Sequence, residues 1–373
     1  MKILHLYKDY HPVLGGIENI VKWLAESQAK AGHEVTVLVA SLTGQTTQET
    51  LNGVTVHKIG RLTTIASTPI TPTLPLALSQ YQPDIAHVHS PYPPGELLNW
   101  LLGRARFTVI TYHSDVVRQQ TILQFYRPFL KKVLQHADII MPTSANYIDS
   151  SLFLQPHKDK CRVVPLGIDV SHFNVPNLPL AQNLRAPFGT PLLLFVGRLR
   201  YYKGLNTLID AMRYIPQAKL LIVGHGPLKS ELENQVNIAG LNQRVHFAGD
   251  VNDDELLAYF QAADVFVLPS NSRAEAFGIV LLEAMASGLP CVATELGTGT
   301  SWIVQHGVTG LVVPPETPEL MAAAINIIIT NEPLRQQLGQ AARQRVETMF
   351  TKTVMTQRVL EVYNELLNSK KKQ

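Results

Sequence analysis

Short apolar runs alternate with amphipathic stretches along most of the chain. Such alternation of strands and helices is typical of α/β proteins with a doubly wound parallel sheet. The strands predicted in the first half are Lys2–Leu6, Glu34–Val39, Val54–Lys58, Asp84–His89, Phe107–Thr111, Asp138–Met141 and Arg162–Val164. The helices predicted between them are Ile17–Ala31, Leu74–Gln80, Gly95–Leu102, Val116–Gln135 and Ala145–Leu154.

The alternation stops and then starts again. Residues 167–190 carry scattered prolines and polar residues, which predicts an interdomain linker. From Pro191 a second alternation begins, and after Thr317 the pattern is purely helical. We therefore predict one domain over residues 1–175, a second over 190–350, and a terminal helix over 351–373. The strands predicted in the second domain are Leu192–Val196, Lys219–Val223, Val245–Ala248, Val265–Leu268, Cys291–Ala293 and Gly310–Val313.

Composition supports this organisation. A chain of 373 residues is too long for one ordinary core. Charged residues make up 16% of it, against roughly 25% in a typical domain, which suits parallel sheets buried on both faces. The apolar runs are too short for a membrane span, and the N-terminus does not have the pattern of a secretory signal. Cys161 and Cys291 are isolated, which favours a reducing compartment, and we expect a cytoplasmic protein.

The net charge of +3 is mild, and no basic stripe with interleaved aromatics is present, so a nucleic-acid partner is not expected. One segment stands out, because no acidic residue lies between Asp115 and Asp138. A basic amphipathic helix there could lie on an anionic membrane surface, or it could be a solvated surface helix. Its basic residues are Arg118, Arg127, Lys131, Lys132 and His136.

The segment from Asp264 to Cys291 carries the strongest chemical signal. A strand ends at Pro269, a polar loop carries Glu275, and a helix that starts near Gly278 carries Glu283. The unpaired amides at the start of that helix would face a phosphate group. The two carboxylates are too far apart to act as one acid pair, but each can bind a different hydroxyl-bearing part of one ligand. The amides in question belong to Phe277, Gly278 and Ile279.

In each domain, one further turn follows the first strand. The turn Gly197–Gly204 places Arg198 and Lys203 at a strand end beside a helix N-terminus, which suits a diphosphate; an exposed basic turn is the alternative. Gly15 and Gly16 precede a helix and allow a close backbone approach, although this signal is weak alone. The fingerprint G-x-G-x-x-G is absent from these turns, which disfavours a dehydrogenase.

His113 ends a strand of the first domain, where its side chain can hydrogen-bond a sugar hydroxyl or a leaving phosphate. The strand histidines His5, His87 and His89 are expected to be structural. There is no D-x-D, no H-E-x-x-H and no cluster of metal ligands in the sequence, so no metal or other cofactor is expected. A G-x-S-x-G elbow of a serine hydrolase is also absent.

Taken in order, Gly15-Gly16, His113, the Arg198–Gly204 turn and the Glu275-x7-Glu283 segment resemble a retaining family 4 glycosyltransferase of the GT-B fold. The resemblance implies two Rossmann-like domains that face a deep interdomain cleft. The acceptor would bind mostly on the first domain and a nucleotide-sugar mostly on the second. In the family, a final helix crosses back to the first domain, and residues 352–367 would play that part.

The resemblance also implies roles for individual residues. Arg198 and Lys203 would hold the donor diphosphate, Glu283 would bind the ribose, and Glu275 would bind the donor sugar, while a role for Glu275 as nucleophile stays open. Backbone amides of Gly16 and of residues 277–279 would complete the phosphate site. His113 would contact the sugar near the reacting carbon. The turn at Gly249, Asp250 and Val251 would edge the base pocket.

The function implied is transfer of a hexose with retention of configuration and without metal. The donor would be a GDP- or UDP-hexose (mannose, glucose or galactose), with mannose slightly favoured by similarity to polysaccharide mannosyltransferases. The acceptor would be a saccharide or a lipid-linked sugar in surface polysaccharide or glycolipid synthesis. The alternatives are a sugar-nucleotide epimerase or a phosphorylase on the same fold, and a non-catalytic nucleotide-sugar sensor or partner subunit.

Overall fold

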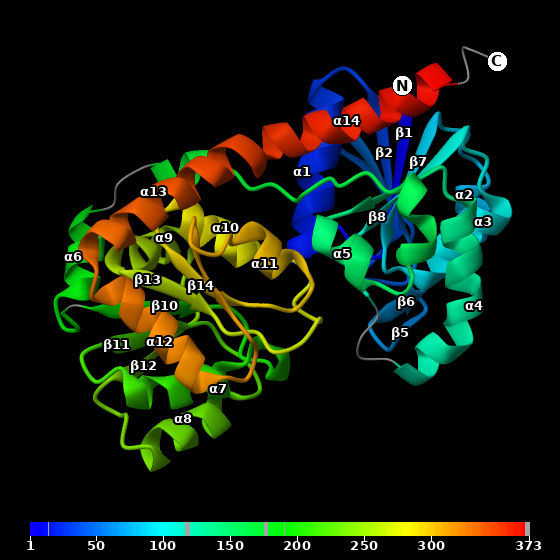
Figure 1. Cartoon of the computed structure of the whole chain (residues 1–373). Coiled ribbons are helices and arrows are strands. Elements are labelled where there is room, and N and C mark those ends of the chain that lie inside the picture. Colours follow the sequence, from blue (N-terminus) through cyan, green and yellow to red (C-terminus); the bar gives the residue numbers. More distant parts are fainter. Residues whose placement is uncertain (14, 116–119, 175–177, 190, 370–373) are drawn as a thin grey trace. The chain divides into compact units, whose positions relative to one another are not determined.

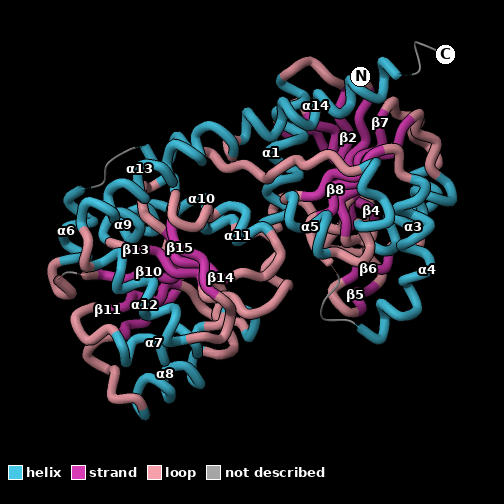
Figure 2. Tube along the Cα trace, viewed as in Figure 1, coloured by secondary structure: helices cyan, strands magenta, loops and turns pink. Residues whose placement is uncertain are grey.

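The computed structural model of the chain describes residues 1–13, 15–115, 120–174, 178–189 and 191–369. The chain divides into two compact units (Figure 1). The first unit comprises Met1–Gly167 and Lys352–Gln373, and the second comprises Ile168–Thr351. Each unit contains one large, mainly parallel sheet with helices packed against it (Figure 2).

The first unit has a seven-stranded sheet in the order β3-β4-β2-β1-β7-β8-β9. Neighbouring strands are parallel except β3, which is antiparallel to β4 at the edge. The order reverses between β1 and β7, and ligands bind at such a switch point in open α/β sheets. The strands are β1 Lys2–Leu6, β2 Glu34–Ala40, β3 Thr47–Leu51, β4 Val54–Ile59, β7 Ile85–Ser90, β8 Phe107–Tyr112 and β9 Ile139–Pro142, with a small separate hairpin of β5 Thr63–Ile65 and β6 Thr68–Ile70.

Two helices from opposite ends of the chain lie side by side in this unit: α1 (Gly16–Lys30) and α14 (Lys352–Ser369) (Figure 1). The Tyr363 side chain of α14 is fully buried, and Glu365 forms an ion pair with Arg162 at 2.7 Å. The remaining helices of the unit are α2 Leu74–Leu78, α3 Pro93–Leu102, α4 Gln120–His136, α5 Ala145–Ser150 and the 3-10 helix η1 Gln155–Lys160.

The second unit has a six-stranded, fully parallel sheet in the order β12-β11-β10-β13-β14-β15. All six predicted strands are present, and every residue of Leu192–Val196 is buried. The strands are β10 Leu192–Val196, β11 Lys219–Val223, β12 Val245–Gly249, β13 Val265–Leu268, β14 Cys291–Thr294 and β15 Gly310–Val313. The helices are η2 Val170–Asn174, α6 Leu178–Arg185, η3 Tyr201–Lys203, α7 Leu205–Ala211, η4 Met212–Tyr214, α8 Lys229–Ile238, α9 Asp253–Ala262, α10 Ile279–Ala286, α11 Gly299–Ile303, α12 Pro318–Ile329 and α13 Glu332–Met349.

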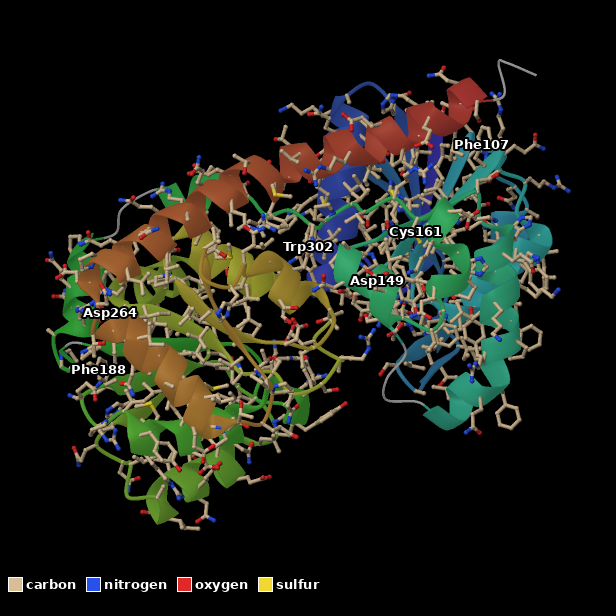
Figure 3. All side chains as sticks on the ribbon, viewed as in Figure 1. Phe107, Asp149, Cys161, Phe188, Asp264 and Trp302 are labelled. Atoms are coloured by element: carbon tan, nitrogen blue, oxygen red, sulfur yellow. The ribbon has the colours of Figure 1, made fainter. Side chains whose placement is uncertain are left out.

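The segment predicted as a linker is instead part of the second unit, which begins at Ile168 rather than near residue 190. Helix α6 packs on α9, and Arg185 donates to Asp264 at 2.8 Å. The same Asp264 carboxylate accepts from the backbone amide of Leu192 at 2.8 Å. Asp264, which is labelled in Figure 3, directly precedes β13. The prolines in this segment therefore did not mark a free linker, because a buried carboxylate ties α6 to the sheet.

Two further differences between the prediction and the structure concern strands. Residues 162–164 do not form a strand: Cys161 makes an isolated bridge to Ile140, and the amide of Arg162 donates to the Ile140 carbonyl at 2.9 Å. Strand β3 was not predicted, because its side chains (TQETL) are mostly exposed and carry no apolar alternation. Of the predicted helix Val116–Gln135, the first four residues lie outside the described part of the chain.

Candidate functional site

The sheet topology of the second unit brings the two strongest sequence signals together. Strands β10 and β13 are parallel neighbours at the switch point of the sheet, with Leu193 opposite Val265. The turn after β10 and the loop after β13 therefore leave the same edge of the sheet. The amide of Asn271 donates to the Tyr202 carbonyl at 3.0 Å, which joins the two segments directly.

Gly204 makes this close crossing possible. Its φ is +64°, in the left-handed region, and a Cβ there would lie 2.0 Å from the Pro269 carbonyl oxygen. No other residue fits both the conformation and the space. Gly197 also has a positive φ, of +150°, but a Cβ on it would be in ordinary van der Waals contact with Lys203, 3.6 Å from the ammonium nitrogen. The side chain of Lys203 thus lies against the backbone at the end of β10.

Lys203 and Glu275 form a buried ion pair at 2.5 Å, in which each side chain is 10% exposed. Ser270 donates a further hydrogen bond to the same carboxylate oxygen at 3.0 Å. Burial lowers the pKa of Lys203, but the charges and hydrogen bond of its neighbours, Glu275 first, outweigh that effect and the pKa lies above its usual value. An ammonium has three donors, so the contact with Glu275 leaves others for an anionic ligand.

The loop that carries Glu275 is held on its other side by the start of α11. Thr298 donates its hydroxyl to the Glu275 carbonyl at 2.9 Å, and the amide of Gly299 donates to the Ala276 carbonyl at 2.9 Å. Helix α10 then begins after Gly278, whose φ is +83°. The amides at the start of a helix lack intrahelical partners and form its positive end, so they can bind an anion.

Glu283 lies on α10 and is half-buried. Burial raises its pKa to about 7, the negative charge of Asp253 adds to the rise, and the positive charge of Lys203 opposes it. Lys203 therefore interacts electrostatically with both carboxylates of the segment, Glu275 by direct contact and Glu283 at longer range. A carboxyl group that titrates near neutrality can accept a hydrogen bond from a ligand hydroxyl or donate one to it.

A hollow of about 500 Å³ opens where β10, β11 and β12 end. Arg198 lines it and is exposed, and it has no ion-pair partner in the described part of the chain. Val251 is half-buried and lies next to Asp250, outside the set of lining residues. The described residues that line the hollow are Arg198, Arg200, His225, Gly226, Pro227 and Asp250.

The comparisons with known proteins agree with this arrangement. The family model for glycosyl transferases group 1 matches residues 180–345, and that for glycosyltransferase family 4 matches residues 14–172. The D-rhamnosyltransferase WbpZ of Pseudomonas aeruginosa is 36% identical, covering 94% of this chain and 92% of its own. The O-antigen chain mannosyltransferase C of Escherichia coli is 35% identical, covering 99% and 100%.

The chain is a group 1, family 4 glycosyltransferase. Its fold is GT-B, as in the sucrose-phosphate synthase of Thermosynechococcus elongatus, with a TM-score of 0.79 and 26% identity over 98% of this chain and 99% of that one. HepE of Anabaena, solved in complex with UDP, has a TM-score of 0.80 at 20% identity over 98% and 100%, which supports the fold. Among the described residues of this glycosyltransferase, no helix combines the length and hydrophobicity needed to cross a bilayer. Its two cysteines are free thiols.

The other predicted residues of this glycosyltransferase belong to the first unit. Gly16 begins α1 and is exposed, after Gly15, where a Cβ would meet the Glu18 carboxylate at 2.2 Å. His113 directly follows β8 and is 3% exposed. Burial lowers the pKa of His113 to about 3, so the ring is neutral at physiological pH. Among the described residues, its Nδ1 atom has no hydrogen-bond partner.

The glycosyltransferase contains functional candidates that sequence reasoning missed. Ser270 and Thr298 hold Glu275, but short hydroxyl side chains in loops give no distinctive signal. His225 lines the hollow and lies in the turn Gly224-His225-Gly226, where Lys229 stands in place of the third glycine of a dinucleotide fingerprint. Thr143 follows β9, which pairs with β8, and its buried hydroxyl also has no partner among the described residues.

The sequence shows no cluster of metal ligands, yet the fold brings three strand histidines together. His5 on β1 and His87 and His89 on β7 have ring nitrogens within 4.8 Å of one another. All three side chains are fully buried. Their ring nitrogens hydrogen-bond to protein groups, so the cluster is satisfied without an ion.

Proposed function

We propose that this glycosyltransferase transfers a hexose from a GDP- or UDP-hexose to a saccharide or lipid-linked acceptor, in the synthesis of a surface polysaccharide or glycolipid. The observation that carries the proposal is the Lys203–Glu275 pair at the switch point, beside Arg198 and the start of α10. The relatives named for D-rhamnosyl and O-antigen mannosyl transfer support a polysaccharide product and favour a mannosyl donor.

In the proposed complex, the second unit binds the donor. Arg198 and Lys203 contact the diphosphate, and the amides of residues 277–279 provide neutral donors to it. Glu275 accepts from hydroxyls of the sugar, and its pairing with Lys203 fixes its position before the ligand arrives. Glu283 binds the ribose hydroxyls. The hollow that Asp250 and His225 line is the proposed base pocket, with Val251 at its edge.

The proposed reaction retains the configuration of the sugar and needs no metal ion. The bond between the anomeric carbon and the phosphate oxygen breaks, and the acceptor oxygen attacks the same face. The acceptor proton passes to the leaving diphosphate, whose developing charge Arg198 and Lys203 stabilise. His113 and the amide of Gly16, on the first unit, would contact the donor sugar and phosphate.

Helix α4 supports a lipid-linked acceptor and contact with an anionic membrane surface at the inner face of the membrane. Phe125 and Phe129, one turn apart, are 77% and 47% exposed, and Lys131 and Lys132 are exposed on the same helix. Aromatic and basic side chains together bind anionic interfaces. Arg118, which was included in the predicted basic segment, lies outside the described residues.

Vesicle cosedimentation tests the membrane contact. We expect the protein to pellet with vesicles that contain anionic lipid and not with neutral vesicles. A Phe125→Ser, Phe129→Ser variant should pellet less, while Leu152→Ser, which removes another exposed apolar side chain (70%), should pellet like the wild type. Equal pelleting with both vesicle types, or of all the variants, would remove the membrane proposal.

Nucleotide release tests the transfer itself. The protein is mixed with a lipid-linked or oligosaccharide acceptor and, one at a time, with GDP-mannose, UDP-glucose and UDP-galactose. We expect nucleoside diphosphate release from one of these donors, dependent on the acceptor and unaffected by a metal chelator, with the α- or β-configuration of the donor kept in the product. Binding without release would favour a nucleotide-sugar sensor, and inversion of configuration would refute the proposed mechanism.

A further inference from the structure

A chain of hydrogen bonds runs through the interior of the first unit and ends at His113. His5 Nε2 lies 2.7 Å from Gln28 Oε1, and His5 Nδ1 lies 3.0 Å from His89 Nε2. His89 Nδ1 in turn lies 3.1 Å from His113 Nε2. Gln28, His5 and His89 are fully buried, and His113 is 3% exposed. Four side chains from α1, β1, β7 and the end of β8 are therefore connected in one line.

The three histidines of this line are neutral. Burial lowers the pKa of His5 to about 4 and of His113 to about 3, and it also lowers the pKa of His89 well below the usual value. A neutral imidazole has one N–H donor and one lone-pair acceptor. In a line of neutral rings, the direction of the first hydrogen bond therefore fixes the direction of all the others.

Gln28 sets that direction. Its Oε1 can only accept, so His5 carries its proton on Nε2 and accepts at Nδ1. His89 must then donate from Nε2 and accept at Nδ1, and His113 must donate from Nε2. The Nδ1 atom of His113 is left as a lone pair, and this is the buried atom that has no partner among the described residues.

A second branch of hydrogen bonds begins at the Gln28 amino group. Gln28 Nε2 donates to the Tyr363 hydroxyl at 3.5 Å, and the Tyr363 hydroxyl lies 2.6 Å from His87 Nδ1. His87 Nε2 lies 2.6 Å from the Thr111 hydroxyl. Every bond of this branch has one donor and one acceptor when Gln28 directs its amino group toward Tyr363. Helix α14 thus contributes Tyr363 to the hydrogen-bond network inside the first unit.

We propose that Gln28, His5 and His89 are positioning residues that hold His113 in its Nε2–H tautomer, so that Nδ1 accepts a hydrogen bond from a hydroxyl of the bound sugar. The identity of the sugar rests on the proposed function, whereas the tautomer does not. A ring with the opposite tautomer would present a donor to the ligand instead, and would select for an acceptor atom. The direction of the hydrogen bonds along Gln28, His5 and His89 therefore determines whether His113 offers the ligand an acceptor or a donor.

The test is the tautomer of His113 in the full-length protein without ligand. With ¹⁵N-labelled histidine, long-range ¹H–¹⁵N correlations distinguish protonated from unprotonated ring nitrogens, and a His113→Asn spectrum assigns the signals. We expect Nε2–H at His5, His89 and His113. A wild-type spectrum with Nδ1–H at His113 would overturn the proposal without any further variant.

Variants at Gln28 test whether Gln28 determines the tautomer of His113. Gln28→Leu removes the acceptor, so both tautomers of His113 should be populated and kcat should fall on the order of tenfold, the scale of one hydrogen bond. Gln28→Glu keeps an acceptor oxygen and should keep the Nε2–H tautomer. Tyr363→Phe breaks only the second branch and should leave His113 unchanged. An unaltered tautomer in a folded Gln28→Leu protein would refute the proposal.

Two further results distinguish this proposal from a metal site and from the proposed transfer reaction. A stoichiometric metal ion in the purified protein, removed by a chelator with a change in the His5 and His89 signals, would overturn it, because the line needs those nitrogens for hydrogen bonds. If instead His113 has the expected tautomer but no donor is turned over, the proposed transfer fails while the inference about the tautomer stands.

Discussion

At the scale of single residues, replacing Lys203 should reduce both activity and stability, whereas replacing Arg198 should reduce activity alone. Lys203→Ala removes one stabiliser of the leaving group and leaves the buried Glu275 carboxylate unpaired. We predict a loss of at least about 10²-fold in kcat. The unfolding free energy should also fall by about 3–5 kcal/mol, the usual cost of breaking a buried pair. Arg198→Ala should lose comparable activity without loss of stability, because Arg198 is exposed. Activity assays and urea unfolding measure the two effects.

A double variant separates the two roles of Lys203. Lys203→Met combined with Glu275→Gln removes both charges, so no uncompensated charge remains buried, and stability should return toward that of the wild type. Activity should stay low, because the diphosphate still lacks its cation. Recovery of activity in the double variant would mean that Lys203 serves only to neutralise Glu275.

The raised pKa of Glu283 predicts that the stability of the protein depends on pH. Its pKa is about 7 in the folded protein and 4.5 in its ordinary state, so the folded state binds the proton more tightly. The stabilisation that results is fully present below pH 4.5 and is lost as the pH rises through about 7. Thermal unfolding between pH 5 and 8 should show this decline, and Glu283→Gln should reduce it. An identical pH profile in Glu283→Gln would contradict the assigned pKa.

At the scale of elements, the crossing of the two site loops depends on Gly204. Gly204→Ala adds a Cβ at 2.0 Å from the Pro269 carbonyl oxygen, in addition to the strain of a φ of +64°. Gly240→Ala is a matched control, since its φ is +67° and nothing lies within 4 Å. The control should lose about 1–2 kcal/mol from backbone strain alone. Gly204→Ala should lose clearly more unfolding free energy than Gly240→Ala, and it should also lose activity. Equal losses of unfolding free energy in the two variants would show that the two loops do not cross closely at Gly204.

The same elements show what the sequence could predict. Strands β10 and β13 could be predicted because both are continuous apolar runs, as expected for strands whose residues are all buried. The Gly, Pro and charged residues that flank them marked the site loops. Strand β3 was missed because an exposed edge strand has no apolar signature. The link between Gln28 and Tyr363 could not be predicted, since the two residues are 335 positions apart and only the fold brings them together. Hydrogen-bond partners of this kind depend on tertiary packing rather than on local pattern.

At the scale of the whole molecule, α14 joins the C-terminal end of the chain to the first unit. Tyr363→Ala should cost the first unit about 3–5 kcal/mol, as for other large buried side chains. Asn364→Ala, an exposed neighbour on the same helix, should change stability by no more than about 0.5 kcal/mol. Hydrogen exchange should show faster exchange of β1 and β7 in Tyr363→Ala and unchanged protection in β10 and β13. Uniform loss of protection in both sheets would contradict independent stabilities of the units.

The central claim is that the second unit binds a nucleoside diphosphate through Arg198 and Lys203. Calorimetric titration of GDP and of UDP into the wild-type protein and into Arg198→Ala tests it, with Arg213→Ala as a control because that arginine is exposed and pairs with Asp210 away from the hollow. We predict that the wild type and Arg213→Ala bind one of the two nucleotides, and that Arg198→Ala binds it at least about tenfold more weakly, the loss of one charged hydrogen bond. Equal affinity in wild type and Arg198→Ala, or no binding of either nucleotide by the folded wild type, would contradict the account.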